Sequence, residues 1–492
     1  MKAKQTLMVQ GTTSDAGKSV LVVALCRILS NHGYRVAPFK PQNMALNSAV
    51  TNNGGEIGRA QAVQAEAARV EATVDMNPVL LKPNSDIGAQ VIVHGKSIGN
   101  SDAVDYHAMK PQLLGAVLES YKRLSEAFEV VIVEGAGSPA EINLRDRDIA
   151  NMGFAEEADC PVVIVADIDK GGVFAHLVGT YELLSETEKA RVKGFIINKF
   201  RGDITLLKPG NDWLEQKLGV PVLATIPFIP NLYIEPEDAL DFNQIVTTQN
   251  ILNVTVVVYP RISNHTDFDV LRLHPHIKLH YARSPNEVNA CDLLILPGSK
   301  SVMADLGHLI SEGWQTYINR HLRYGGKIFA ICGGMQMLGE KLYDPMGIES
   351  HQRELAGLGH LPIQTTLMAN KTLNKTKGEC LETNIKVSGY EIHAGITEAL
   401  DECERIFKLD NGDFEGYQSS DNQIKATYLH GIFDNPEYLT TILSWAGIAN
   451  ITSFDYEAEK DKQIETLANA VACALPMEKI KSLLSLPRDT AK

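Results

Sequence analysis

The stretch Gly11-Thr12-Thr13-Ser14-Asp15-Ala16-Gly17-Lys18-Ser19 lies near the N-terminus, between an apolar strand-like run and a helix-like run. The N–H groups of such a glycine-rich loop form a nest for phosphate at the start of a helix. The lysine adds a charge for the terminal phosphates, and the serine hydroxyl can reach Mg²⁺. We predict that Gly11, Gly17, Lys18 and Ser19 bind ATP, with Asp15 as a weaker candidate. One departure is the spacing, because five residues separate the glycines instead of four.

Short apolar runs alternate with longer helix-like stretches on both sides of this loop. The runs cover residues 7–9, 36–39, 91–93, 130–133, 162–165, 195–197 and 222–224. Nearly continuous Val and Ile runs are typical of parallel strands that are buried on both faces and joined by crossover helices. The first part of the chain is therefore predicted to be a doubly wound α/β domain.

Polar residues at the ends of later runs complete the predicted nucleotide site. Glu134 follows the run 130–133 and precedes Gly135-Ala136-Gly137. A carboxylate at that strand end is a common second Mg²⁺ ligand, so we predict that Ser19 and Glu134 hold the metal. Asn198 and Lys199 follow the run 195–197 and are candidates for contacts to the base. A strand followed by a solvated lysine explains that pair equally well.

A second motif, Ile331-Cys332-Gly333-Gly334-Met335-Gln336, lies far along the chain, after the apolar run 327–331. Two glycines allow a sharp turn from strand to helix. A cysteine at such a turn lies at a helix N-terminus, where the dipole favours the thiolate, and it is close to backbone N–H donors. We predict that Cys332 is a nucleophile for acyl chemistry. Gly334 and the Gly298 loop are candidate oxyanion donors.

The nucleophile needs a base, which the fold must bring from elsewhere. Among fourteen histidines, His430 follows the strand-like run 426–429 and precedes Gly431. His393, in Gly389-Tyr390-Glu391-Ile392-His393, is the rival. The residues alone favour His430 about two to one.

Composition limits the class of protein. With 492 residues the chain is long enough for two or three domains. Its net charge of −14 argues against non-specific nucleic-acid binding. We expect a cytoplasmic protein that binds neither nucleic acid nor membrane, because no run of eighteen apolar residues is present. The seven cysteines are dispersed and lack a Cys-x-x-Cys pair, so a disulfide scaffold is not expected.

The domain boundaries follow from where the pattern breaks. Residues 1–235 are predicted to form the phosphate-loop domain, and 236–250, with prolines and a polar stretch, the linker. Residues 251–447 are predicted to form a second doubly wound α/β domain. Residues 448–492 are expected to be a helical tail.

The combination resembles the cobyric acid synthase family (CobQ/CbiP). The C-terminal half resembles class I glutamine amidotransferases, and the N-terminal half resembles dethiobiotin-synthetase-like ATPases with the same loop spacing. The stretches 39–48, 56–61, 143–152, 166–174 and 389–393 match the family's signatures.

The resemblance implies an enzyme that amidates the b, d, e and g carboxylates of adenosylcobyrinic acid a,c-diamide, using ATP, Mg²⁺ and glutamine. It also assigns the nucleophile to Cys332 and the base to His430, not His393. Many amidotransferases carry Glu two residues after the histidine, but Ile432 stands there. The residue that orients His430 is therefore left open.

The corrin substrate is polyanionic, so basic side chains in the family's signatures are candidate contacts. These candidates are Lys40, Arg59, Lys82, Arg145 and Arg147. Asp146 and Asp148 could bind Mg²⁺ or position the reacting carboxylate.

Three other interpretations compete with this one. The sister enzyme, cobyrinic acid a,c-diamide synthase, would have the same domains, but the long stretches 39–48 and 143–152 favour cobyric acid synthase. A partition-type ATPase would share the phosphate loop and have no use for Cys332 and His430. A C-terminal domain that only binds glutamine is disfavoured because both catalytic residues are present.

Overall fold

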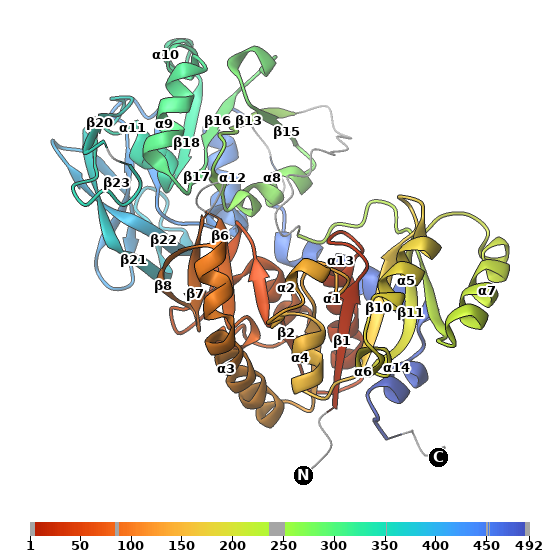
Figure 1. The fold of residues 1–492 in the computed structure, drawn as a ribbon. Helices are drawn as coiled ribbons and strands as arrows, with labels where there is room; N and C mark the ends of the chain where they lie inside the picture. The colour runs from red at the N-terminus through yellow and green to blue at the C-terminus, as the bar shows by residue number, and fades with distance from the viewer. Residues whose placement is uncertain are drawn as a thin grey trace. The chain divides into compact units, whose positions relative to one another are not determined.

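The computed structural model describes residues 5–83, 88–235, 251–350, 352–448, 451 and 453–487. The chain forms two compact units (Figure 1). Unit 1 contains Met1–Glu237 and Glu459–Lys492, and unit 2 contains Asp238–Ala458. The predicted linker, 236–250, lies outside the described residues. The region 448–492, predicted to be a helical tail, contains helices at Tyr456–Ala474 and Met477–Leu483, and Glu459–Lys492 are grouped with unit 1.

Unit 1 is built on a six-stranded parallel sheet in the order β12-β11-β10-β1-β9-β2. Central strand β1 leads directly into the phosphate loop. The strands are β1 (Gln5–Gly11), β2 (Val36–Phe39), β9 (Val130–Glu134), β10 (Val162–Asp167), β11 (Val192–Phe200) and β12 (Val222–Pro227).

Helices cover both faces of this sheet, as a doubly wound fold requires. One apolar core packs strand residues against α1, α2, α13 and α14, and the other packs them against α3, α4, α5 and α7. The helices are α1 (Lys18–Asn31), α2 (Arg59–Ala67), α3 (Ala103–Ala127), α4 (Met152–Glu157), α5 (Val173–Glu182), α6 (Glu186–Lys189), α7 (Lys208–Leu218), α13 (Tyr456–Ala474) and α14 (Met477–Leu483).

The prediction for residues 91–93 was wrong, because this run is not part of the parallel sheet. It belongs to β7 (Gly88–Val93), which pairs antiparallel with β6 (Val79–Pro83) and β8 (Lys96–Asp102). With β3 (Gln42–Met44) these strands form a separate four-stranded sheet, and β4 (Ser48–Val50) pairs with β5 (Glu56–Gly58). Only His94 and Gly95 separate β7 from β8, which leaves no room for the helix that a parallel crossover needs.

Unit 2 has an eleven-stranded mixed sheet. Its parallel part, β15-β13-β16-β18-β25, contains the predicted run 327–331 as β18 and the first residues of the run 426–429 in β25. The parallel strands are β13 (Leu252–Val257), β15 (Ile277–Ala282), β16 (Leu293–Leu296), β18 (Lys327–Ile331) and β25 (Ile424–Thr427).

The rest of the unit 2 sheet is an extension dominated by a long antiparallel hairpin of β21 and β22. The remaining elements are β14 (Ile262–Ser263), β17 (Gly298–Ser299), β19 (Lys341–Tyr343), β20 (Glu354–Ala356), β21 (Ile363–Cys380), β22 (Lys386–Ala399), β23 (Glu404–Leu409), β24 (Phe414–Gln418), α8 (Asp269–Leu273), α9 (Val302–Ser311), α10 (Trp314–Arg323), α11 (Gly333–Leu338) and α12 (Pro436–Trp445).

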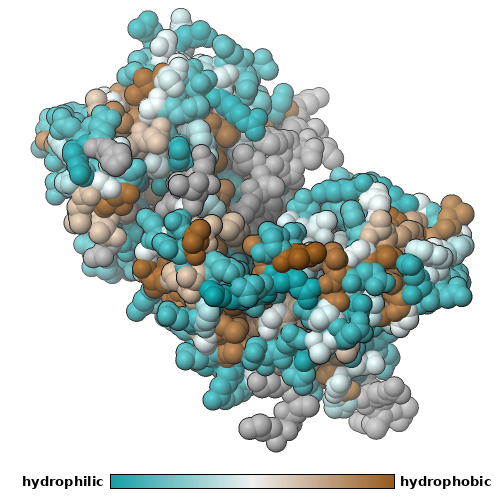
Figure 2. Space-filling model, viewed as in Figure 1, coloured by the Kyte–Doolittle hydropathy of each residue, from teal (hydrophilic) through white to brown (hydrophobic). Residues whose placement is uncertain are grey.

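None of the described helices is both long and apolar enough to cross a membrane. Hydrophilic residues cover much of the face shown in Figure 2, and the apolar residues on it lie in separate patches.

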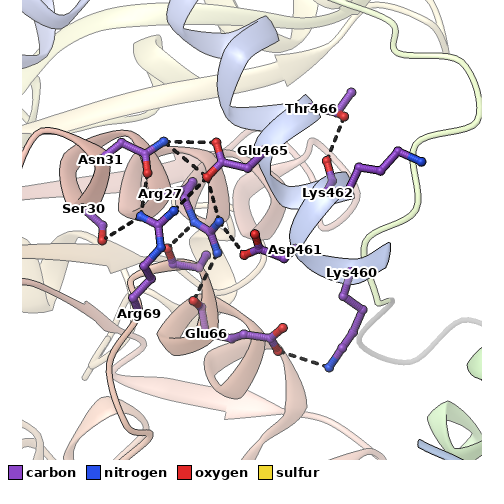
Figure 3. Close-up of polar contacts among 11 residues, drawn as sticks. Arg27, Ser30, Asn31, Glu66, Arg69, Lys460, Asp461, Lys462, Glu465 and Thr466 are labelled. Carbon is purple, nitrogen blue, oxygen red and sulfur yellow. Dashed lines mark hydrogen bonds and ion pairs between the residues drawn. The ribbon is translucent and has the colours of Figure 1, made fainter. Parts of the chain in front are cut away.

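Ion pairs join helix α13 to α1, the helix that follows the phosphate loop (Figure 3). The side chain of Arg27 on α1 is buried and donates to Asp461 at 2.6 Å and to Glu465 at 2.9 Å. Arg69 also pairs with Glu465, at 2.9 Å. The α13 carboxylates therefore balance the buried charge of Arg27 on the helix that follows the phosphate loop.

We expect the double substitution Asp461→Asn with Glu465→Gln to destabilise unit 1 by about 3 kcal/mol, because it leaves the Arg27 guanidinium buried without a counter-charge. Denaturant unfolding of the full chain, followed by a probe in unit 1, measures the change. Lys462→Ala on the same helix is the control, since Lys462 is exposed and pairs only with Glu459 across one turn. A change of at most 0.5 kcal/mol in both variants would contradict this role for Arg27.

Candidate active sites

In unit 2, the predicted elbow is present between β18 and α11. Cys332 has φ 52° and ψ −109°, a strained conformation for a residue with a side chain. Its N–H donates to the carbonyl of Thr427 at 2.8 Å, and its carbonyl accepts from the N–H of Gln336 at 3.1 Å. These bonds hold the strained residue between a neighbouring strand and the first turn of the helix.

The glycines around Cys332 are sterically required. A Cβ on Gly333 would lie 2.8 Å from the Ser299 nitrogen, and one on Gly334 would lie 2.1 Å from the Leu296 carbonyl oxygen. A Cβ on Gly298 would lie 3.3 Å from the His430 ring. The structure thus brings the Gly298 loop and the elbow together, as predicted. It adds the Ser299 amide as a candidate oxyanion donor that the sequence did not single out.

His430 lies just after β25, where its backbone pairs with Tyr390. Its Nδ1 lies 2.6 Å from the carboxylate of Asp267, and both side chains are buried. Burial alone lowers the pKa of His430. The charge of Asp267 and hydrogen bonds to Asp267 and Cys332 outweigh burial and raise this pKa to about 10. A charged imidazole next to Cys332 is the arrangement of a Cys–His nucleophile pair.

Asp267 is the orienting group that the sequence left open. Its second oxygen accepts from the N–H of Gly431 at 3.0 Å, which fixes the carboxylate beside the histidine. Asp267 precedes His430 by 163 residues and lies in a short 3₁₀ turn after β14. No local pattern marks this aspartate, so a sequence argument could have found it only through the fold.

His393 has other partners. Its Nδ1 lies 2.8 Å from the Gly395 carbonyl oxygen, and its Nε2 lies 3.6 Å from a Glu391 oxygen. The ring stacks on Tyr428 with 3.7 Å between ring centroids. This geometry favours His430 over His393 as the base.

In unit 1, Lys18 forms hydrogen bonds within the phosphate loop and to the segment after β9. The Lys18 ammonium donates to the carbonyls of Thr13 at 2.9 Å, Ser14 at 3.1 Å and Gly137 at 2.9 Å. Gly17 has φ 99°, and a Cβ there would lie 2.1 Å from the Asn198 amide nitrogen. Asn198 therefore packs against the loop, and its side chain donates to the Ala16 carbonyl at 3.1 Å.

The predicted metal ligands lie together. The Ser19 hydroxyl donates to Glu134 at 2.7 Å, and Glu134 is fully buried. Burial raises the pKa of Glu134, but the charge of Lys40 and hydrogen bonds from Ser19, Gln64 and Lys40 outweigh it and lower this pKa. A buried carboxylate held in its charged form beside a hydroxyl is a suitable oxygen donor set for Mg²⁺.

Lys40 was predicted to contact the substrate, but its ammonium lies 3.0 Å from Glu134 and is buried. Three other basic candidates are also ion-paired in the structure. Arg59 pairs with Glu235 at 2.6 Å, Lys82 pairs with Glu56, and Arg145 pairs with Glu188.

The acidic candidates differ in their surroundings. Asp148 accepts from the N–H groups of Ala150 at 2.8 Å and Gly153 at 3.0 Å, so it shapes its own loop. Asp146 is exposed and lies 3.6 Å from His107 and 3.7 Å from Arg147.

Two further candidates for nucleotide contacts are ion-paired. Asp15 is exposed and pairs with Lys170 at 2.9 Å. Lys199 pairs with Asp167 at 2.8 Å. Within the described ranges, no three His, Cys, Asp or Glu side chains cluster as a metal site, so Ser19 and Glu134 would need nucleotide oxygens and water to complete a Mg²⁺ shell.

Comparison with known proteins gives two family matches. Residues 7–242 match the CobQ/CobB/MinD/ParA nucleotide binding domain, and residues 253–438 match the CobB/CobQ-like glutamine amidotransferase domain. Solved structures that resemble the chain include a glutamine amidotransferase, with 18% identity over 40% of this chain and 99% of that chain and a TM-score of 0.32.

Two others come from Thermotoga maritima. PurLQS has 15% identity over 45% of this chain and 99% of that one, with a TM-score of 0.30. A second glutamine amidotransferase has 12% identity over 48% of this chain and 99% of that one, with a TM-score of 0.28. The two family matches together place this protein in the CobQ-type amidotransferases, enzymes that fuse a nucleotide-binding ATPase domain to a glutamine amidotransferase domain.

Proposed function

We propose that the enzyme is a cobyric acid synthase, which amidates the b, d, e and g carboxylates of adenosylcobyrinic acid a,c-diamide with ATP and glutamine. The resemblance of stretches 39–48 and 143–152 to that family supports this substrate. The pairing of a Cys332–His430–Asp267 site with a phosphate loop in one chain carries the proposed chemistry.

Ammonia is released in unit 2. The Cys332 thiolate attacks the side-chain amide carbon of glutamine, and the Ser299 and Gly334 amides face the oxyanion. His430 gives a proton to the leaving nitrogen, so that the C–N bond breaks and ammonia departs. Water, deprotonated by His430, then hydrolyses the thioester to glutamate. Asp267 holds the imidazole in the orientation that both steps need.

The acceptor is activated in unit 1. A carboxylate is a poor electrophile, so its oxygen takes the γ-phosphoryl group of ATP and ADP leaves. Ammonia then attacks the acyl carbon, the C–O bond to phosphate breaks, and the nitrogen loses a proton. Lys18 and the loop amides hold the phosphates. Ser19 and Glu134 would hold Mg²⁺, which neutralises charge on the phosphates when it is bound.

The main alternative is cobyrinic acid a,c-diamide synthase. Incubation with MgATP and glutamine, separately with cobyrinic acid and with its a,c-diamide, distinguishes the two. We expect the a,c-diamide to be amidated and cobyrinic acid to be left at its a and c positions. Selective amidation of the a and c positions would establish the alternative.

We expect His430→Ala to slow the trapping of Cys332 by a glutamine-analogue electrophile by roughly a thousandfold, because the substitution removes the proposed base. His393→Ala should leave the trapping rate within a few-fold of wild type, because the His393 ring contacts the Gly395 carbonyl and stacks on Tyr428. Mass spectrometry of the Cys332 peptide gives both rates. Slow trapping in the His393 variant alone would reassign the base.

We expect Asp267→Asn to lower stability in a pH-dependent way. Burial lowers the pKa of His430, but Asp267, with a smaller contribution from Cys332, outweighs it and raises this pKa from 6.5 to about 10, so folding favours the protonated form. The stabilisation is fully present below about pH 6.5 and is lost as the pH rises through about 10. The free energies of unfolding of wild type and variant should therefore differ most at pH 6 and become equal above about pH 10. Asp269→Asn is the control because it faces Arg272, at 3.5 Å. If the difference in free energy of unfolding does not change with pH, the pairing of Asp267 with His430 is contradicted.

A further inference from the structure

A pocket of about 200 Å³ lies beside the phosphate loop in unit 1. Its lining includes Gln42 of β3, Lys110 of α3 (Figure 1), Gly137 and Ser138 after β9, and Leu144. Gly137 is also the residue whose carbonyl accepts from Lys18 at 2.9 Å. The pocket is therefore next to the group assigned to the terminal phosphates of ATP, where the acceptor of that phosphate has to bind.

Lys110 is the unusual residue of this pocket. It is 9% exposed, and within the described part of the chain its ammonium has no hydrogen bond and no ion pair. Burial lowers the pKa of Lys110 and outweighs the charges of Asp148 and Asp146, which raise it. Asp148 already accepts from backbone N–H groups of its own loop. Lys110 is thus a largely buried lysine whose ammonium can pair with an anion that enters the pocket from solution.

Two further donors line the same pocket. Gln42 accepts from the Tyr106 hydroxyl at 2.7 Å through its oxygen, which leaves its NH₂ group without a partner among the described residues. The Ser138 hydroxyl oxygen accepts from the N–H of Ala140 at 3.2 Å, and its own proton has no acceptor among them. An ammonium, an amide and a hydroxyl that all donate suit the oxygens of a carboxylate.

We propose that Lys110, with Gln42 and Ser138, binds the acceptor carboxylate that is to be phosphorylated. This assignment rests on the proposed function and names the residues that position its substrate. Arg145 also lines the pocket but pairs with Glu188, and the acidic Glu141 and Asp148 line it too, so a singly charged carboxylate fits better than a free phosphate. Leu144 at the rim is 53% exposed and gives an apolar contact to the body that carries the carboxylate.

The first test uses acetate, the smallest carboxylate, and the full chain labelled with ¹³C at the lysine ε-carbon. The Lys110 signal is assigned by its absence from Lys110→Gln. We expect acetate to shift this signal saturably and to leave the signal of Lys122, an exposed lysine on the same helix, unchanged. Equal acetate effects on Lys110 and Lys122, or no effect on Lys110, would overturn the proposal. This arm does not depend on which substrate the enzyme uses.

The second test measures ammonia-dependent amidation of the a,c-diamide. Lys110→Gln should raise the KM for the corrinoid on the order of 10- to 100-fold and leave the KM for ATP unchanged. Lys122→Gln should change neither. An unchanged corrinoid KM in an active Lys110→Gln enzyme would overturn the proposal. If acetate shifts Lys110 but wild type does not amidate the corrinoid, the proposed function fails and the carboxylate site stands.

Discussion

Cys332→Ser is expected to abolish glutamine-dependent amidation and to leave ammonia-dependent amidation close to the wild-type rate. The Cys332 sulfur serves only to release ammonia from glutamine, and free ammonia supplies the same nucleophile to unit 1. Loss of the attacking thiolate removes covalent catalysis, so glutaminase activity should fall by a factor on the order of 10⁶. Initial rates with glutamine and with ammonium chloride, measured on the same preparation, test both halves of this statement.

The control for this variant is Cys473→Ser, at an exposed cysteine in the other unit. It should retain both activities. Equal loss of glutamine-dependent and ammonia-dependent amidation in Cys332→Ser would contradict the division of labour between the units.

Lys18→Ala is expected to abolish amidation from both nitrogen sources. Without the lysine the γ-phosphate is not positioned, no acyl phosphate forms, and ammonia has nothing to attack. Losing such a charge on a transferring phosphoryl group costs on the order of a thousandfold in rate. Glu134→Gln should have an effect of the same kind, because it weakens the metal site and leaves the Lys40 ammonium without its counter-charge at 3.0 Å.

Trapping of Cys332 by the glutamine analogue should continue in the Lys18 and Glu134 variants, which reports an intact unit 2. Lys193→Ala, at an exposed lysine of β11, is the matched control and should keep full activity. Substantial ammonia-dependent amidation by Lys18→Ala would mean that the phosphate loop is not the synthetase site.

The sequence predicted most of the parallel strands because each one is a contiguous run of buried apolar residues. It did not predict the hairpin of β21 and β22, whose strands are mostly polar and bury only scattered apolar side chains such as Ile363, Leu367 and Ile392. It also gave no reason to place α13 in unit 1. That placement depends on Arg27, a residue more than four hundred positions earlier, whose burial no local pattern reveals.

The candidate sites divide in the same way. The loop 11–19 and the elbow at Cys332 were predicted because all their residues are contiguous. Their glycines stand where a Cβ atom would clash with neighbouring atoms. Asp267 and Lys110 were not predicted, since a single aspartate in a turn and a single lysine on a helix carry no signal until the fold shows what surrounds them. The role predicted for Lys40 stays a prediction. A basic residue in a signature stretch suggested a substrate contact, and the structure pairs it with Glu134.

The most direct measurement is the transfer of labelled nitrogen into the corrinoid. Wild-type enzyme is incubated with adenosylcobyrinic acid a,c-diamide, MgATP and glutamine labelled with ¹⁵N in its side-chain amide, and the product is analysed by mass spectrometry and ¹⁵N NMR. We predict ¹⁵N-amides at the b, d, e and g positions, with one ATP and one glutamine consumed for each amide. Consumption of glutamine and ATP with no ¹⁵N in the corrinoid would contradict the proposed function.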